Sequence, residues 1–89
     1  MLDLIYQSKF KKDFERAKKR GKKLKKLETI INLLLNEKSL PAKNRNHKLS
    51  GNYNHHWECH IEPDWLLIYL KNDTEIILVR TGSHADLFE

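Results

Sequence analysis

The sequence predicts an α+β fold, in which an N-terminal strand and a two-helix antiparallel hairpin pack on a mainly antiparallel β-sheet, with a short helical turn at the C-terminus. Two patterns lead to this prediction. Apolar residues between positions 10 and 35 recur at helical spacings, whereas those between 57 and 79 alternate or form short continuous runs. The length of 89 residues allows one domain, 1–89, with a small core.

The chain is expected to begin with a short strand and a first helix. Residues 2–6 alternate at first and are bounded by a polar pair, which is typical of a strand. Ser8 is expected to cap the helix, because its hydroxyl can accept from backbone N–H groups one turn further on. Gly21 breaks the helical pattern and should end it in a left-handed conformation. The apolar stripe of this helix consists of Phe10, Phe14 and Ala17.

A second helix is expected over residues 24–35. Two helices joined by so short a turn should pack antiparallel, with their lysines on the outer faces. Pro41 stops any helix, and residues 36–46 have the composition of a polar connector. The apolar stripe of the second helix consists of Leu24, Leu27, Ile31 and Leu34, widened by Ile30 and Leu35.

The second half predicts a meander of three strands. Residues 57–62 alternate between apolar and polar, which indicates a strand with one polar face. The runs 66–70 and 76–79 are nearly continuous in apolar residues, as in central strands covered on both faces. Ser83 is expected to cap a last helical turn over 84–88. The turns between the strands fall at Pro63-Asp64 and Asn72-Asp73.

The net charge of +5 is concentrated at one end of the chain. Residues 1–28 hold eleven Lys and Arg against four Asp and Glu, a net of +7, and residues 29–89 hold six against eight, a net of −2. Such a field attracts polyanions or an acidic protein segment. The alternative is a solvated helical hairpin that lysine keeps soluble. The centre of this basic segment consists of Lys18, Lys19, Arg20, Lys22, Lys23, Lys25 and Lys26.

Size and composition exclude several classes of protein. The chain is too short for a multidomain enzyme or a dinucleotide-binding fold. It contains no run near the ~18 apolar residues of a membrane span, and its start lacks the basic region of a secretory signal. Cys59 is the single cysteine, so neither an internal disulfide nor a four-cysteine zinc site can form. These features favour a protein of the reducing cytoplasm.

All five histidines lie after residue 46, and some of them could act together. If the predicted strands are neighbours, His60, Asp64 and His84 could share one end of the sheet. Two imidazoles and a carboxylate suit acid–base chemistry near neutral pH, including RNA cleavage by attack of a ribose 2′-OH on the adjacent phosphorus. Arg80 is a candidate for the cation that stabilises the added negative charge. The alternative is that these are ordinary surface or partly buried histidines.

A metal site is a second alternative. His56, Glu58 and His60 fall on one face of the predicted strand, and three such side chains could bind a transition-metal ion. Cys59 points to the opposite face, however, and no second ligand pair has zinc-finger spacing. We therefore expect no metal.

Three blocks of sequence carry a resemblance to a known family. They are HKLSG at 47–51, ECHIEPDWLLIY at 58–69 and RTGSHADLF at 80–88, in this order and with matching gaps. With them, nearly the whole chain resembles the YafQ-type toxins of the RelE-like toxin–antitoxin superfamily. The resemblance implies a RelE-like, microbial RNase-like fold and ribosome-dependent cleavage of mRNA in the A site, without a metal or other cofactor. It also implies a cognate antitoxin that wraps and neutralises a toxin that is monomeric when free.

The resemblance also implies a set of catalytic residues. The catalytic histidine that the family has near its C-terminus falls on His84, which we expect to be the general acid. His47, His60 and Asp64 fall on the other active-site positions, where they would supply the general base and orient it. Of these, His47 or Asp64 is the favoured base. The basic segment 18–26 would contact ribosomal RNA or acidic segments of the antitoxin.

Substrate-binding residues follow from the same resemblance. Phe88 matches an aromatic residue that the family uses near the substrate, and Trp65 lies beside Asp64, so either ring could stack on a base. The alternatives are a plug on the core for Phe88 and a hydrophobic anchor at a strand start for Trp65.

The chain departs from the family at Trp57, where relatives commonly have an arginine that would hold the scissile phosphate. Arg80 is then the matched cation, unless Lys48 or Arg45 reaches the substrate.

Two other functions are compatible with the sequence. A ParE-like toxin that binds gyrase would have the same fold and basic helices, but that branch generally lacks the set of His60, Asp64 and His84. A plain RNA-binding module would need only the basic segment.

Overall fold

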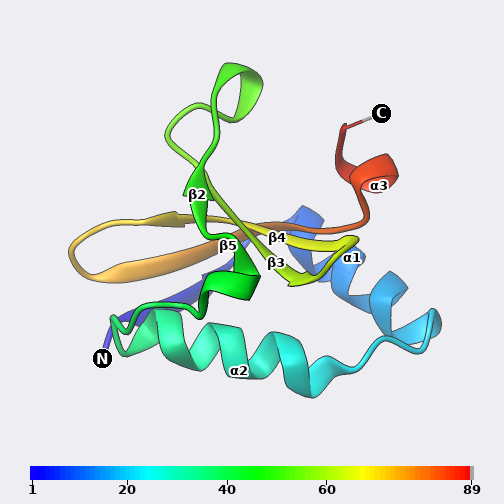
Figure 1. The fold of residues 1–89 in the computed structure, drawn as a ribbon, viewed down its shortest axis with the longest axis horizontal. Coiled ribbons are helices and arrows are strands. Elements are labelled where there is room, and N and C mark those ends of the chain that lie inside the picture. Colours follow the sequence, from blue (N-terminus) through cyan, green and yellow to red (C-terminus); the bar gives the residue numbers. More distant parts are fainter. Residues whose placement is uncertain (89) are drawn as a thin grey trace.

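One five-stranded sheet organises the chain, and the computed structural model describes residues 1–88 (Figure 1). The strand order is β1-β5-β4-β3-β2, with β1 parallel to β5 and the other neighbours antiparallel. The strands are β1 (Asp3–Tyr6), β2 (His47–Lys48), β3 (Trp57–Glu62), β4 (Trp65–Lys71) and β5 (Glu75–Gly82). The helices are α1 (Ser8–Lys19), α2 (Leu24–Leu35) and α3 (His84–Phe88), with short 3₁₀ turns η1 (Ala42–Asn44) and η2 (Gly51–Tyr53). The expected α+β fold is confirmed.

The two faces of the sheet are covered by different elements. The first helix, α1, packs against β5, and α2 packs against β3 and β5. Figure 1 shows α2 running along one face, while α3 and the loop that carries η2 rise on the other side of the sheet. The helices α1 and α2 therefore cover one face of the sheet, and short elements and side chains cover the other. No helix in the described part of the chain is both long and apolar enough to cross a membrane.

The central strand β4 packs on both sides, as its apolar run predicts. Leu67 and Tyr69 belong to the core under α1 and α2, and Leu66 and Ile68 belong to a smaller cluster on the opposite face. All four side chains are at most 2% exposed. The smaller cluster also contains Val79 and Leu87. Because Leu87 comes from α3, this cluster holds the C-terminal helix against the sheet.

The predicted helix ends are confirmed at two positions and wrong at one. Gly21 has a φ of +75° and follows α1, as expected for a left-handed cap. The hydroxyl of Ser83 accepts from the backbone N–H of Asp86 at 3.1 Å, and the Asp86 carboxylate accepts from the N–H of Ser83 at 2.9 Å, so Ser83 caps α3. Ser8, in contrast, is the first residue within α1, and Gln7 precedes the helix without a side-chain cap.

The segment between α2 and β3 has more structure than the expected connector. The range 36–46 contains η1, and the residues after it form β2 and η2. In the short ladder of β2 with β3, His47 pairs with Glu58. The side chain of Asn46 accepts from the Tyr69 hydroxyl at 2.7 Å, which fastens the segment to the core. This ladder brings His47 to the polar face of β3.

Candidate active site

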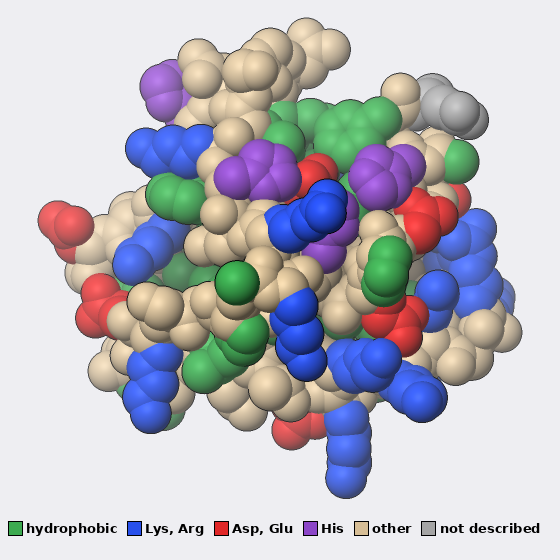
Figure 2. Space-filling model, in the orientation of Figure 1, with side chains coloured by type: hydrophobic (Ala, Val, Ile, Leu, Met, Phe, Trp, Pro, Cys, Tyr) green, Lys and Arg blue, Asp and Glu red, His purple; other side chains and the backbone are tan. Residues whose placement is uncertain are grey.

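Three elements bring His47, His60 and His84 together in a row, which we call the histidine row. His47 is in β2, His60 is in β3, and His84 begins α3. The ring centroids of His47 and His60 are 6.4 Å apart, and those of His60 and His84 are 5.8 Å apart. Figure 2 shows histidines gathered on one face of the molecule, with Lys and Arg side chains around them. The structure therefore brings the predicted histidines together.

Asp64 joins this row through His84. Its Oδ1 lies 2.6 Å from Nδ1 of His84 and also accepts from the backbone N–H of His84 at 2.9 Å. Both hydrogen bonds hold the pKa of Asp64 below its ordinary value, and the bond from the backbone N–H makes the larger contribution. An ionised carboxylate only accepts, so Nδ1 of His84 donates and Nε2 is left free to exchange a proton with a substrate.

A buried carboxylate that the sequence prediction did not assign to catalysis lies between the other two histidines. Glu58 is 5% exposed, and its Oε1 is 3.4 Å from Nε2 of His47 and 3.6 Å from Nε2 of His60. Its Oε2 is buried with no hydrogen-bond partner among residues 1–88. Alternation in β3, which places Glu58 and His60 on one face, was the signal that could have identified it.

Backbone carbonyl oxygens fix the orientation of these two rings. Nδ1 of His47 donates to the carbonyl oxygen of Arg45 at 2.6 Å, and Nδ1 of His60 donates to that of Pro63 at 3.3 Å. A carbonyl oxygen only accepts, so each Nδ1 carries a hydrogen and each Nε2 faces Glu58. The arrangement gives both rings a shared carboxylate with which a proton can be exchanged.

The two aromatic residues predicted to stack on bases differ in their surroundings. Phe88 is 48% exposed, its ring centroid lies 6.5 Å from that of His84, and it packs edge-on against Tyr53. It is available for stacking. Trp65 is 1% exposed and donates from Nε1 to Oγ1 of Thr81 at 3.0 Å, so its ring is packed in the core at the start of β4 and is not exposed for stacking.

The guanidinium of Arg80, which the sequence predicts as the cation of the site, is bound by a carboxylate within the protein. Its Nε and Nη2 donate to the carboxylate of Asp13 at 2.6 and 3.2 Å, and Asp13 is 5% exposed. This bond ties β5 to α1 and neutralises the cation.

Lys48 is exposed, with its Nζ 5.4 Å from the ring centroid of Trp57. Trp57 itself stacks on Tyr69, so the position at which the family resemblance implied an arginine serves packing in this chain.

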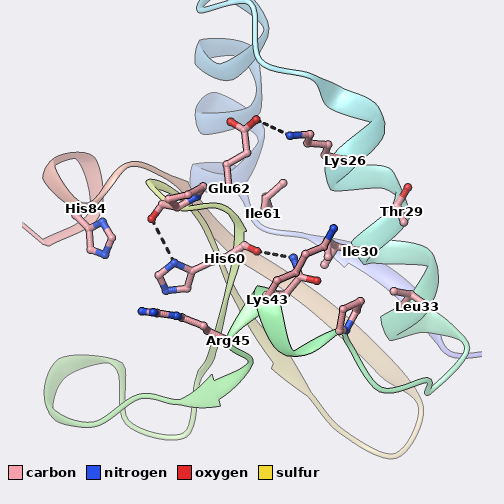
Figure 3. A pocket seen from close by; sticks show the side chains of 13 residues that line it. Lys26, Thr29, Ile30, Leu33, Lys43, Arg45, His60, Ile61, Glu62 and His84 are labelled. Carbon is pink, nitrogen blue, oxygen red and sulfur yellow. Dashed lines mark hydrogen bonds and ion pairs between the residues drawn. The ribbon is translucent and has the colours of Figure 1, made fainter.

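A groove of about 860 Å³ opens beside the histidine row. His60 and His84 line one end, and Ile30 and Leu33 of α2 line the opposite wall (Figure 3). The groove is also lined by the cations Lys26, Lys43 and Arg45. The groove therefore combines acid–base groups with positive charge, which suits a polyanionic substrate.

Within residues 1–88, no three His, Cys, Asp or Glu side chains are arranged as a group that could hold a metal ion. His56 bonds to the carbonyl oxygen of Asn54 in its own loop. Cys59 is fully buried, and burial, with a smaller contribution from Glu58, raises the pKa of its thiol to about 12.

The basic segment 18–26 lies beside the same end of the sheet. Lys22 and Lys26 form ion pairs with Glu62, which precedes the turn that carries Asp64. Arg20 donates to Asp86 of α3 at 2.6 Å. Among residues 1–88, three lysines of the segment have no carboxylate within ion-pair distance. They are Lys19, Lys23 and Lys25.

The ion pair of Arg20 with Asp86 makes a prediction for acid stability. Chiefly through this hydrogen bond, the pKa of Asp86 lies far below its ordinary value. The pair stabilises the folded state fully at pH values above the unfolded-state pKa of about 3.9, and this stabilisation is lost as the pH falls below that value. We expect Asp86→Asn to lower the free energy of unfolding more at pH 6 than at pH 3, measured by urea denaturation. Equal losses at both values would contradict this.

Comparison with known proteins gives a consistent result. Residues 2–89 match the family model described as bacterial toxin of type II toxin-antitoxin system, YafQ. The chain is 40% identical over 87 residues to the mRNA interferase toxin YafQ of Escherichia coli strain K12, covering 97% of this chain and 95% of that protein. The crystal structure of YafQ from E. coli BL21(DE3) matches with a TM-score of 0.94 at 38% identity over both full chains. The E. coli DinJ-YafQ toxin-antitoxin complex matches at 0.92 and 39%, covering 99% and 98%.

Proposed function

The chain belongs to the YafQ family of bacterial toxins from type II toxin–antitoxin systems, and on this basis we propose that it is an mRNA interferase, a ribosome-dependent endoribonuclease that stops translation. The observation that carries the proposal is the histidine row with Asp64 and Glu58, at the end of a groove with basic lining residues. Acid and base groups on neighbouring sites are what cleavage of RNA through its own 2′-OH requires.

In this reaction His84 is the general acid. Asp64 holds its Nδ1, and Nε2 delivers a proton to the departing 5′-oxygen. His47 is the favoured base, because its side chain is 48% exposed whereas that of His60 is 13% exposed. Nε2 of His47 takes the proton of the 2′-OH, the 2′-oxygen bonds to phosphorus, and the bond to the 5′-oxygen breaks. The remaining product end is a 2′,3′-cyclic phosphate.

The experiment is primer extension on mRNA after brief expression of the toxin. We expect cuts at fixed positions relative to codons, and the same cuts from purified protein only when ribosomes are added. An absence of cuts together with gyrase-linked DNA breaks would assign the chain to the ParE-like class. An absence of cuts with salt-sensitive RNA binding would assign it to RNA-binding modules.

A cognate antitoxin is the second partner of the proposal. The family consists of toxins of type II toxin–antitoxin systems, and the similar E. coli toxin is found in a complex with DinJ. We expect an antitoxin to bind this chain and neutralise it, and the free toxin to be monomeric. The basic segment offers charge for an acidic antitoxin segment as well as for ribosomal RNA.

The basic segment makes a separate prediction for ribosome association. Substituting Lys19, Lys23 and Lys25 by glutamine should weaken binding, because each phosphate contact releases counterions and adds to the salt dependence. We expect the slope of log affinity against log salt to fall by about two to three, measured by co-sedimentation with ribosomes. The matched control replaces Lys9, Lys11 and Lys12 near the start of α1. Equal losses from both triple variants would show that the basic segment has no special role.

A further inference from the structure

Arg45 has a backbone conformation that favours glycine. Its φ is +45° and its ψ is +49°, which is the left-handed region. The residue ends η1, where its N–H donates to the carbonyl oxygen of Ala42 at 3.1 Å. Its own carbonyl oxygen accepts from Nδ1 of His47 at 2.6 Å. Uncommon backbone conformations of this kind concentrate at functional sites.

The turn that carries Arg45 is fastened to the histidine row on two sides. Its preceding neighbour Asn44 is 5% exposed and donates from Nδ2 to the carbonyl oxygen of His60 at 2.7 Å. The bond to His47 is on the other side. The position of Arg45 relative to both histidines is therefore fixed by hydrogen bonds.

The side chain of Arg45 is the free guanidinium of this site. Of the four arginines in the sequence, three are engaged by carboxylates, and for Arg45 no carboxylate lies within ion-pair distance among residues 1–88. Arg45 lines the groove together with His60 and His84. Figure 3 shows its guanidinium extending toward the imidazole of His60.

We propose that Arg45 binds the scissile phosphate, in place of the matched cation Arg80, which Asp13 holds. This inference rests on the proposed function. A guanidinium donates two parallel hydrogen bonds to phosphate oxygens and carries a permanent charge. A phosphodiester beside His60 would have the base His47 and the acid His84 on either side, with Arg45 stabilising the added charge on phosphorus during attack.

The test separates the side chain from the backbone by replacing Arg45 with glycine and with lysine. Glycine adopts the left-handed region without strain, so Arg45→Gly should keep the melting temperature of the wild type or raise it. We expect its cleavage rate on ribosome-bound mRNA at saturating toxin to fall about 100-fold. Arg45→Lys keeps the charge but loses the paired donors, so its cleavage rate should fall about 10-fold.

Binding gives a readout that a structural role would not change. On ribosomes whose mRNA carries a 2′-deoxy nucleotide at the cleavage position, Arg45→Gly should reduce the slope of log affinity against log salt by about 0.7, the value for one phosphate contact on a single strand. The matched control is Lys38→Gln, which removes one exposed charge from the loop after α2. It should leave the cleavage rate unchanged.

The outcomes distinguish this inference from the proposed function. If the wild type cuts mRNA and Arg45→Gly cuts at the same rate, the role of Arg45 is overturned while the nuclease remains. An unchanged salt slope would also overturn it. If the wild type does not cut at all, the proposed function fails, and the role of Arg45 in that reaction fails with it.

Discussion

Replacing His84 with alanine will lower the rate of mRNA cleavage by about 10³-fold. A positioned general acid contributes roughly 10² to 10⁴ to such a reaction, because the 5′-oxygen must otherwise leave as an alkoxide. His84 lies at the exposed start of α3, so its removal costs little packing. The rate is measured in single-turnover assays on programmed ribosomes, and relief of growth arrest is the cellular counterpart.

Asp64 and His84 should act as one unit in this assay. Asp64→Asn removes the carboxylate that holds Nδ1–H of His84, so the imidazole of His84 loses its fixed tautomer and orientation. The double variant should then be about as slow as His84→Ala alone, because coupled residues are not additive. Both variants should still bind the antitoxin. His55→Asn is the matched control, since His55 is an exposed histidine with positive φ, a conformation that asparagine tolerates.

A His84→Ala protein that cut mRNA at the wild-type rate would remove His84 from the reaction. Multiplied losses in the double variant would show that Asp64 acts on the substrate by itself, as the favoured alternative base, rather than through His84. The double variant therefore also tests whether Asp64 is the base.

The sequence predicted the elements that have strong local signals. β3, β4 and β5 follow from their apolar patterns and from the turns at Pro63-Asp64 and Asn72-Asp73. β2 was missed because it is two residues long and lies in a polar segment, so no period can develop. It exists through its pairing with β3, which local sequence does not encode.

The sequence predicts the histidines and Asp64 of the candidate site but not the roles of its other charged residues. The histidine row follows from the family blocks and the meander, and the structure places its members as neighbours. The sequence identifies Glu58 only as a possible metal ligand, because it does not show that β2 pairs beside it. The sequence predicts Arg80 as a free cation, because it does not show the pairing with Asp13, which is 67 residues away in the chain. Such pairings depend on how α1 packs on β5.

The pairing of Asp13 with Arg80 carries the second large prediction. Asp13 accepts from Arg80 at 2.6 Å, from Arg16 at 3.0 Å and from the backbone N–H of Thr81 at 3.1 Å. Asp13→Ala leaves these donors without their acceptor, and removing one partner of a buried ion pair costs roughly 3–5 kcal/mol. Arg80 keeps a 17% exposed side chain, so we expect about 3 kcal/mol, measured as the urea midpoint and slope. A loss below about 1 kcal/mol would contradict a structural role for this pair.

A double variant then separates folding from substrate binding. Asp13→Leu with Arg80→Met replaces both charges by apolar side chains, which often costs much less than breaking a buried pair. We expect it to recover at least half of the stability that Asp13→Ala loses, since Arg16 keeps Asp86 at 3.7 Å. If Arg80 serves only to join β5 to α1, the double variant should cut mRNA at a rate near that of the wild type. A 100-fold slower rate in a folded double variant would instead indicate that Arg80 binds the scissile phosphate. The loss in Arg45→Gly would then have to come from RNA outside the scissile bond, so the two variants together determine which guanidinium holds the reacting group.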